Sequence, residues 1–466
     1  MSRDAAIARA ESYYDDGELY ADLARRVAIP SSSQDAKYKP DLDHYLEGEM
    51  TPWFEDRGFD CAIYPNPKEG GPPFLIASRV EDAGLPTVMT YGHGDVVLGH
   101  EGRWSDDRDP WTLDRDGEGD AERWYGRGTA DNKAQHTINL AAMDAVLAER
   151  GSLGFNVVCM IETGEEVGSP GIRDFARQHA DLFQACDLLV ASDGPRIKPD
   201  QATIFLGSRQ VFNFWMTLDL RQGGHHSGNW GGLLANPGVI LSHALASIVD
   251  AKGRIKLEAL KAPPMSNSVR DAIARLTLEG GDDAPEIDPD WGEPGLTTEE
   301  KVFASNTFEI LAMETGSPAN PVNAVPPRAR MACHIRYVAG SDPDTFLPAI
   351  QDHLEASGFD GVELSVRREE VVPATRLDPD HPWARWAVAS MERTTGAEVA
   401  VIPNLGGTLP NDAFASILGL PTIWVPHSYA GCKQHAPDEH VLAPVMRDAM
   451  RVMAGLWWDL GDGGTP

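Results

Sequence analysis

The chain has 466 residues, a length that favours two to four domains. It contains 71 Asp and Glu against 40 Lys and Arg, and this formal net charge of −31 argues against nucleic acid and anionic membranes as partners, because both attract basic proteins. Five scattered cysteines without a CxxC pair favour reduced thiols, and hence a cytoplasmic protein. No signal peptide is evident at the N-terminus, and no apolar run reaches the roughly 18 residues of a membrane span.

The N-terminal part of the chain alternates predicted helices with short apolar runs. Helices are predicted over 5–28, 40–57 and 132–150, and strands over 61–65, 74–80, 86–92, 154–162 and 186–192. The last two apolar runs are bounded by Gly, Asp and Pro, which is typical of buried strands. Their alternation with helices predicts a largely parallel sheet.

The pattern changes after about residue 206. Here strands are predicted over 210–221, 328–338 and 362–372, and helices over 237–250 and 342–357. This part indicates a smaller domain with an open sheet. Its residues 262–300 are rich in Pro, Asp and Gly and form an excursion from the pattern.

From about residue 375 the pattern of the N-terminal part, helices alternating with short apolar runs, returns. A helix is predicted over 382–394 and a strand over 398–402, followed by a glycine-rich turn, another helix, the apolar run "PTIWVP" and a last helix over 441–459. We therefore predict that residues 207–372 form a domain inserted into a larger one, which consists of residues 1–206 and 373–466.

Side chains of the types that bind metals stand near the ends of several predicted strands, at one helix start and in the C-terminal part. They are His93, Asp131, Glu166, Asp193 and His435. Because the C-terminal ends of parallel strands converge on one edge of a sheet, we expect these five side chains to meet. Two imidazoles and three carboxylates suit two divalent ions if one carboxylate is shared, and Asp131 is the candidate bridge. Zinc is expected, and manganese and cobalt also suit this ligand set.

Two glutamates stand side by side at 165 and 166, where like charges repel. Neighbouring side chains point in different directions, so Glu166 can bind metal while Glu165 faces the attacking water as general base. Burial of Glu165 would raise its pKa. Asp95, two residues after His93, would accept the imidazole N–H and orient the ring. Each residue alone also fits a turn, a solvated loop or a surface histidine, and only their joint occurrence at predicted strand ends favours a catalytic site.

Several segments together resemble a known family: "IPSSSQD", "GHGDVV", "GRGTADNKA", "ETGEEVGSPG", "ASDGP", "HHSGNWGG", "NAVPPRARMACHIR", "GGTLPND" and "HAPDEH". In order and spacing they are similar to the dinuclear-metal exopeptidases and deacylases. This family includes cytosolic nonspecific dipeptidase, carnosinase, glutamate carboxypeptidase, acetylornithine deacetylase, succinyl-diaminopimelate desuccinylase and aminoacylase. The length of the 262–300 excursion resembles the dipeptidase and carboxypeptidase branch.

The resemblance implies an α/β catalytic domain with a mixed, mainly parallel sheet flanked by helices, and an inserted ferredoxin-like α+β lid that mediates dimerisation. It places His93 and Asp193 on one zinc ion and Glu166 and His435 on the other, with Asp131 as the bridge. It also implies a cis Asp131–Asn132 peptide bond and agrees with Glu165 as the base.

Substrate-binding roles follow from the same resemblance. His226 resembles a lid histidine that stabilises the tetrahedral oxyanion, often across a dimer interface. Arg336 resembles an arginine that binds a substrate carboxylate, with a strand-end salt bridge as the alternative. Asn323 is a candidate donor to substrate or a turn residue before Val-Pro. Gly407 and Thr408 are candidates to donate backbone N–H groups.

Two positions depart from the family pattern. Ala134 stands where the family often has Gly, and Leu405 stands where dipeptidase-like members often have Glu. The second departure weakens the resemblance to a general dipeptidase. We expect a homodimer that hydrolyses an amide or peptide bond next to a free carboxylate, as a dipeptidase or carboxypeptidase does. The alternatives are a deacylase of N-acyl or N-carbamoyl amino acids with the same site, and a non-catalytic metal-binding protein of this fold.

Overall fold

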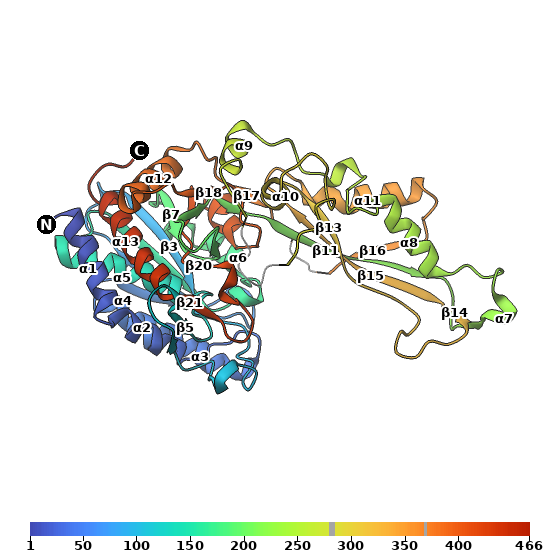
Figure 1. The fold of residues 1–466 in the computed structure, drawn as a ribbon, viewed down its shortest axis with the longest axis horizontal. Helices are drawn as coiled ribbons and strands as arrows, with labels where there is room; N and C mark the ends of the chain where they lie inside the picture. The colour runs from blue at the N-terminus through green and yellow to red at the C-terminus, as the bar shows by residue number, and fades with distance from the viewer. Residues whose placement is uncertain (279–284, 368–370) are drawn as a thin grey trace.

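The computed structural model describes residues 1–278, 285–367 and 371–466. Figure 1 shows an elongated molecule with a larger part, which carries both chain ends, and a smaller part that extends from it. We call the smaller part the lid. None of the described helices combines the length and the apolarity that a membrane crossing requires.

The first helices surround one side of the larger part. Two helices, α1 (Arg3–Asp15) and α2 (Glu18–Val27), replace the single helix expected over 5–28. Gly17 separates them with a φ of 83°, a left-handed conformation that favours glycine and turns the chain. The helix expected over 40–57 is a succession of α3 (Lys39–His44), a π-helical segment (Tyr45–Met50) and α4 (Thr51–Glu55).

Within the described residues, an eight-stranded sheet forms the centre of the larger part, in the order β1-β2-β6-β3-β7-β19-β9-β18. The central strands from β6 to β19 run parallel, as do β9 and β18, whereas β1 and β2 pair antiparallel. This confirms the mixed, mainly parallel sheet. The strands are β1 (Asp60–Tyr64), β2 (Phe74–Arg79), β3 (Thr87–His93), β6 (Asn156–Glu162), β7 (Leu188–Ala191), β9 (Thr203–Phe205), β18 (Ala400–Ile402) and β19 (Thr422–Trp424).

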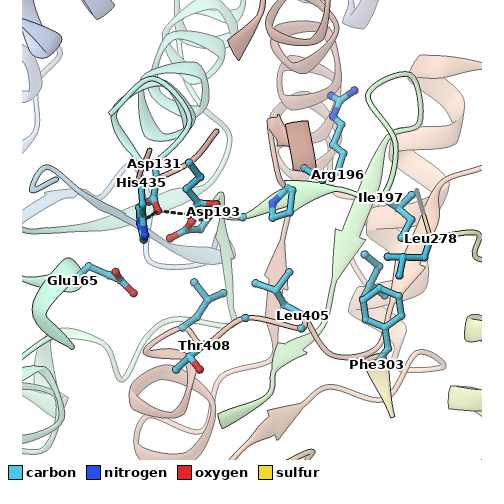
Figure 2. Close-up of a pocket in the computed structure, with 18 residues that line it drawn as sticks. Asp131, Glu165, Asp193, Arg196, Ile197, Leu278, Phe303, Leu405, Thr408 and His435 are labelled. Carbon is cyan, nitrogen blue, oxygen red and sulfur yellow. Dashed lines mark hydrogen bonds and ion pairs between the residues drawn. The ribbon is translucent and has the colours of Figure 1, made fainter. Parts of the chain in front are cut away.

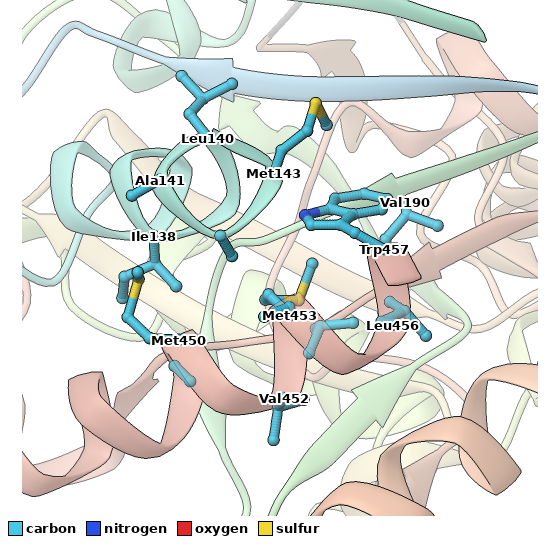
Figure 3. Close-up of a cluster of buried hydrophobic side chains, with 14 of the residues drawn as sticks. Ile138, Leu140, Ala141, Met143, Val190, Met450, Val452, Met453, Leu456 and Trp457 are labelled. Atoms are coloured by element: carbon cyan, nitrogen blue, oxygen red, sulfur yellow. The ribbon is translucent and has the colours of Figure 1, made fainter. Parts of the chain in front are cut away.

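Helices cover both faces of this sheet. Successive strand residues point to opposite faces, so Cys159 packs into one apolar cluster and Met160 into another. The first cluster lies under α1, α5 (Lys133–Arg150), α12 (Pro382–Thr395) and α13 (Ala443–Leu460). Figure 3 shows Ile138 of α5 beside Met450 of α13 in this cluster. The second cluster lies against α6 (Ile172–Gln178).

The lid contains a four-stranded sheet within the described residues, in the order β13-β15-β11-β16, with antiparallel neighbours throughout. Its elements follow each other as β11 (Gln210–Asp219), α8 (Pro237–Ile248), β13 (Thr307–Thr315), β15 (Arg328–Tyr337), α11 (Phe346–Ala356) and β16 (Glu363–Val366). This order and connectivity confirm the ferredoxin-like arrangement. The sequence did not predict β13, and residues 368–370 of the strand expected over 362–372 lie outside the described residues.

The chain passes between the two parts at two adjacent places, because β10 (Gly207–Ser208) pairs with β17 (Thr375–Arg376). These crossings lie near the predicted boundaries after residues 206 and 372, and the domain boundaries themselves stay a prediction. The excursion contains α9 (Asn267–Ile273) and α10 (Thr298–Phe303). Although it belongs to the inserted sequence, it packs onto the second apolar cluster of the larger part.

Short strands complete the described structure: β4 (Asp114–Asp116), β5 (Arg123–Tyr125), β8 (Pro195–Arg196), β12 (His225–His226), β14 (Ala324–Val325), β20 (Ser428–Tyr429) and β21 (His440–Leu442). The last of these occupies the start of the helix expected over 441–459, so α13 begins two residues later than predicted.

Candidate metal centre and active site

The parallel strands bring the predicted ligands to one edge of the central sheet. His93 is the last residue of β3, and Asp193 follows the end of β7. The loop after β6 carries Glu166, and the loop before α5 carries Asp131. His435 arrives from the C-terminal part of the chain. The expected convergence of these five side chains is therefore present.

Their side-chain atoms form two clusters that share Asp131. In the first cluster, His93 Nε2 lies 2.9 Å from Asp131 Oδ1 and 3.5 Å from Asp193 Oδ2. In the second, His435 Nε2 lies 3.0 Å from Asp131 Oδ2 and 3.0 Å from Glu166 Oε2. Each cluster offers three donor atoms within 4.8 Å of one another, as a divalent ion requires.

The arrangement of the donor atoms fits two cations. Apart from the ion pairs given above, the buried atoms His93 Nε2, Asp131 Oδ1 and Glu166 Oε1 have no hydrogen-bond partner among the described residues. One oxygen of Asp131 belongs to each cluster, as a bridging ligand requires. The Asp131–Asn132 peptide bond is cis, as the family resemblance implied.

Protonation follows from the crowding of these groups. Desolvation raises the pKa of Glu166 to about 7, and neighbouring Asp131 adds to the rise. Hydrogen bonds to Asp131 and Glu166 raise the pKa of His435 to about 11. Burial opposes ionisation of Asp131, but hydrogen bonds from His435 and His93 hold its pKa well below the usual value. These shifts favour protons on the imidazole and on Glu166, and a divalent ion would have to displace these protons on binding.

Glu165 lies beside the clusters and lines the same cavity as Asp131, Asp193 and His435. Figure 2 shows its carboxylate facing this opening, on the side across from Asp193. Desolvation raises the pKa of Glu165 well above its ordinary value, and the neighbouring carboxylates add to the rise. A raised pKa is the shift expected for a desolvated carboxylate, and the role of Glu165 as general base stays a prediction.

Asp95 supports the two glutamates as well as His93. The Nδ1 atom of His93 lies 3.1 Å from the Asp95 carbonyl oxygen and 3.4 Å from its carboxylate. The carboxylate accepts the backbone N–H groups of Glu165 and Glu166, at 3.1 Å each. The buried Asp95 therefore fixes the turn that carries the base and a ligand, a function that the sequence did not indicate.

Glu439 is a further residue that sequence reasoning missed. Its Oε1 accepts the backbone N–H groups of Gly128, Ala130 and Asp131, and its Oε2 accepts a hydrogen bond from Arg127 at 2.5 Å. Both side chains of this ion pair are fully buried. Glu439 thereby fixes the loop of the bridging aspartate. Its place inside the segment "HAPDEH" was the available signal.

The candidate substrate residues fall into two groups. Arg336 reaches the turn at the cavity wall, where its Nη1 donates to the Gly406 carbonyl at 3.2 Å and to Thr408 Oγ1 at 3.3 Å. Gly407 and Thr408 line the cavity themselves. Among the ion pairs of the described residues none includes Arg336, which argues against the salt-bridge alternative.

His226 and Asn323 lie elsewhere. His226 belongs to β12, which pairs with β14, and the Asn323 carbonyl accepts the backbone N–H of Ser227 at 2.9 Å. Figure 1 places α7 (Ser227–Trp230) and β14 at the end of the lid far from the larger part. Within one chain the structure therefore does not bring these two residues to the metal clusters.

Sequence comparison finds metal-dependent and other dipeptidases among the relatives of this chain. A cysteinylglycine-S-conjugate dipeptidase from Corynebacterium striatum is 26% identical over 375 residues, which are 78% of this chain and 77% of the relative. A Cys-Gly metallodipeptidase from Schizosaccharomyces pombe is 26% identical over 354 residues, 72% of each chain.

Solved structures show the same fold. Human carnosine dipeptidase 1 superposes with a TM-score of 0.77 at 21% identity, over 98% of this chain and 99% of that one. An M20 family metallo-carboxypeptidase from Sulfolobus solfataricus has a TM-score of 0.79 at 21% identity, over 96% and 99% of the two chains. Residues 89–459, most of the sequence, match the model of peptidase family M20/M25/M40, so the chain belongs to this family and is a metal-dependent peptide hydrolase.

Proposed function

We propose that the chain hydrolyses a peptide or amide bond next to a free carboxylate, as a dipeptidase or carboxypeptidase. The observation that carries this proposal is the pair of ligand clusters sharing Asp131, with Glu165 beside them in one cavity. His93 and Asp193 would hold one divalent ion, and Glu166 and His435 the other. We favour zinc, with manganese and cobalt as alternatives, because imidazole and carboxylate ligands suit all three.

When bound, two such ions would polarise the scissile carbonyl and make water more acidic. The chain itself supplies the proton transfers. Glu165 takes a proton from the attacking water and passes it to the nitrogen of the leaving amine. Its raised pKa suits this exchange, because the carboxylate then holds the proton between the two steps.

The substrate carboxylate would bind Arg336, whose guanidinium geometry matches it and which already contacts Thr408. His226 and Asn323 would act on the site of a second copy, because they lie at the far end of the lid. This supports a homodimer formed through the lid. The five free cysteines support a cytoplasmic location.

Glu165→Ala tests the proposal directly. Its expected outcome is loss of turnover on a panel of dipeptides and N-acyl amino acids, with two metal ions per chain retained by elemental analysis. Glu165→Gln keeps the volume and serves as the matched variant. Loss of metal from either variant would instead make Glu165 a ligand and overturn the assignment of roles.

The panel also separates two reactions. Cleavage of dipeptides would establish a peptidase, whereas cleavage restricted to N-acyl or N-carbamoyl amino acids would establish a deacylase with the same machinery. Leu405 favours testing the second reaction. Its apolar side chain lines the cavity at a position where a glutamate could bind the free amino group of a dipeptide and leucine cannot.

A further inference from the structure

The cavity at the metal clusters has one polar and one apolar end. The volume of the whole cavity is about 360 Å³, within the range of small-molecule sites. Asp131, Asp193 and His435 lie at one end, and Figure 2 shows Ile197, Leu278 and Phe303 at the other. We call this other end the apolar recess, and Leu405 and Ile402 also line the cavity.

The walls of the recess are packed rather than loose. Phe303 and Leu405 are 4% and 8% exposed, and both belong to the same apolar cluster as Phe205 and Trp424 of the central sheet. Leu278 lies within the excursion, and Phe303 is the last residue of α10, which begins in the excursion and ends just after it, so the inserted sequence builds part of the cavity. Such a wall keeps its shape when a ligand enters.

The recess offers no counter-charge among the described residues. Arg196 lines the cavity, but its Nη1 lies 2.9 Å from Asp448 and its Nε donates to the Pro426 carbonyl. Figure 2 shows its side chain directed away from the apolar residues. The carboxylates that line the cavity, Asp131, Glu165 and Asp193, all lie at the metal end. With the described residues alone, an ammonium or carboxylate placed in the recess would therefore lose its hydration without gaining a partner.

We propose that the recess receives the group on the carbonyl side of the scissile bond, and that this group is apolar and uncharged at its outer end. The proposal rests on the function proposed above, which places the substrate carboxylate at Arg336 and Thr408. The part of the cavity beyond Leu405 is then left for the carbonyl-side group. Phe303 and Leu405 are its specificity-determining residues.

Three substrates with six-carbon acyl groups test the recess: N-hexanoyl-alanine, N-(ε-aminohexanoyl)-alanine and N-adipoyl-alanine. They differ only at the sixth carbon, which is a methyl group, a methylene group that carries an ammonium, or a carboxylate. The hexanoyl compound should exceed both others in kcat/KM by about a hundredfold or more, because the charged ends find no partner among the described residues that line the recess. The comparison of the hexanoyl with the ammonium compound is the more stringent one. The acidic protein attracts the ammonium compound at long range, so a lower kcat/KM for it must arise in the cavity.

Substitutions of the lining residues test whether the wall of the recess causes this substrate selectivity. Phe303→Ala should lower the preference for hexanoyl over acetyl-alanine by about tenfold, because several methylene contacts are lost. Leu405→Glu should raise kcat/KM for the ε-aminohexanoyl compound relative to the hexanoyl one. Val269→Ala is the matched control: it is buried in the same cluster and excursion but does not line the cavity, so it should leave both ratios unchanged.

Binding to Glu165→Gln, measured by calorimetry on protein with two ions per chain, makes the test independent of turnover. Stronger binding of the hexanoyl compound than of both charged ones is expected. Equal affinities, or kcat/KM values within about threefold of one another, would refute the proposed selectivity of the recess and leave the proposed hydrolytic function untouched. Selective binding without cleavage of any substrate by the unaltered enzyme would support the recess and refute the proposed reaction.

Discussion

Glu439 provides a strict test of how the bridging aspartate is held. Glu439→Ala would remove the acceptor for three backbone N–H groups of the loop at 128–131 and leave the buried Arg127 guanidinium without its carboxylate. Both consequences concern groups that water does not reach in the folded protein. The loop would lose its anchor at the residue that serves both metal clusters.

The expected loss of stability follows from these contacts. Breaking a buried ion pair costs about 3–5 kcal/mol, and each unsatisfied buried N–H costs about 1–3 kcal/mol more. Partial relaxation of the loop reduces the sum, so we expect a decrease of about 4–6 kcal/mol in the free energy of unfolding. Glu439→Gln keeps an oxygen for the N–H groups and should lose about 3 kcal/mol.

Urea unfolding of the metal-free protein measures this loss, and calorimetric zinc titration measures the accompanying weakening of metal binding. Asp174→Ala is the matched control, because it removes the exposed ion pair with Arg177 and should cost less than about 1 kcal/mol. A loss below about 1 kcal/mol for Glu439→Ala, with unchanged zinc affinity, would refute the anchoring role. If the Ala variant does not fold, the Gln variant carries the test.

Three further predictions concern metal, assembly and pH. Chelation should abolish hydrolysis and lower Tm, both restored by Zn or Mn, and activity that survives metal removal would contradict the site. Mixing Glu165→Ala with His226→Ala chains should restore about a quarter of the activity if His226 acts across a dimer, whereas no recovery would place it outside the partner's site. Desolvation raises the pKa of Glu162 to about 7, so its protonated form stabilises the fold below the unfolded pKa near 4.5, and this contribution is lost as pH rises through about 7. Between pH 5 and pH 8, the free energy of unfolding of the metal-free protein should therefore fall by about 3 kcal/mol because of Glu162, and this fall should be absent from Glu162→Gln. The same pH dependence in both proteins would refute the assignment.

The metal ligands could be predicted because their positions depend on local rules. His93 and Asp193 follow apolar runs that form parallel strands, and the ends of such strands meet at one edge. The ferredoxin-like lid was predicted through the family resemblance. The helix break at Gly17 and the strand β13 were missed, the latter because most of its residues are exposed on both faces and show no alternation.

The rest of the site depends on contacts between distant segments. Glu439 meets the loop at 128–131 across more than 300 positions of sequence, and no local pattern records such a pairing. Asp95 was expected to orient His93, but its contact with the backbone of Glu165 and Glu166 depends on the fold of the loop after β6. Phe303 reaches the cavity only because the excursion returns to the larger part.

This return of the excursion also determines how the lid can move. The two chain crossings form one ribbon, β10 with β17, and a ribbon alone would act as a free hinge. Arg336 also joins the lid to the turn at 406–408, and Ile273 and Phe303 add an apolar contact that is buried in the larger part. Rotation of the lid must then shear this apolar contact, and a substrate group seated against Phe303 would strengthen it. With the substrate group placed as proposed, substrate affinity and lid orientation would be thermodynamically linked.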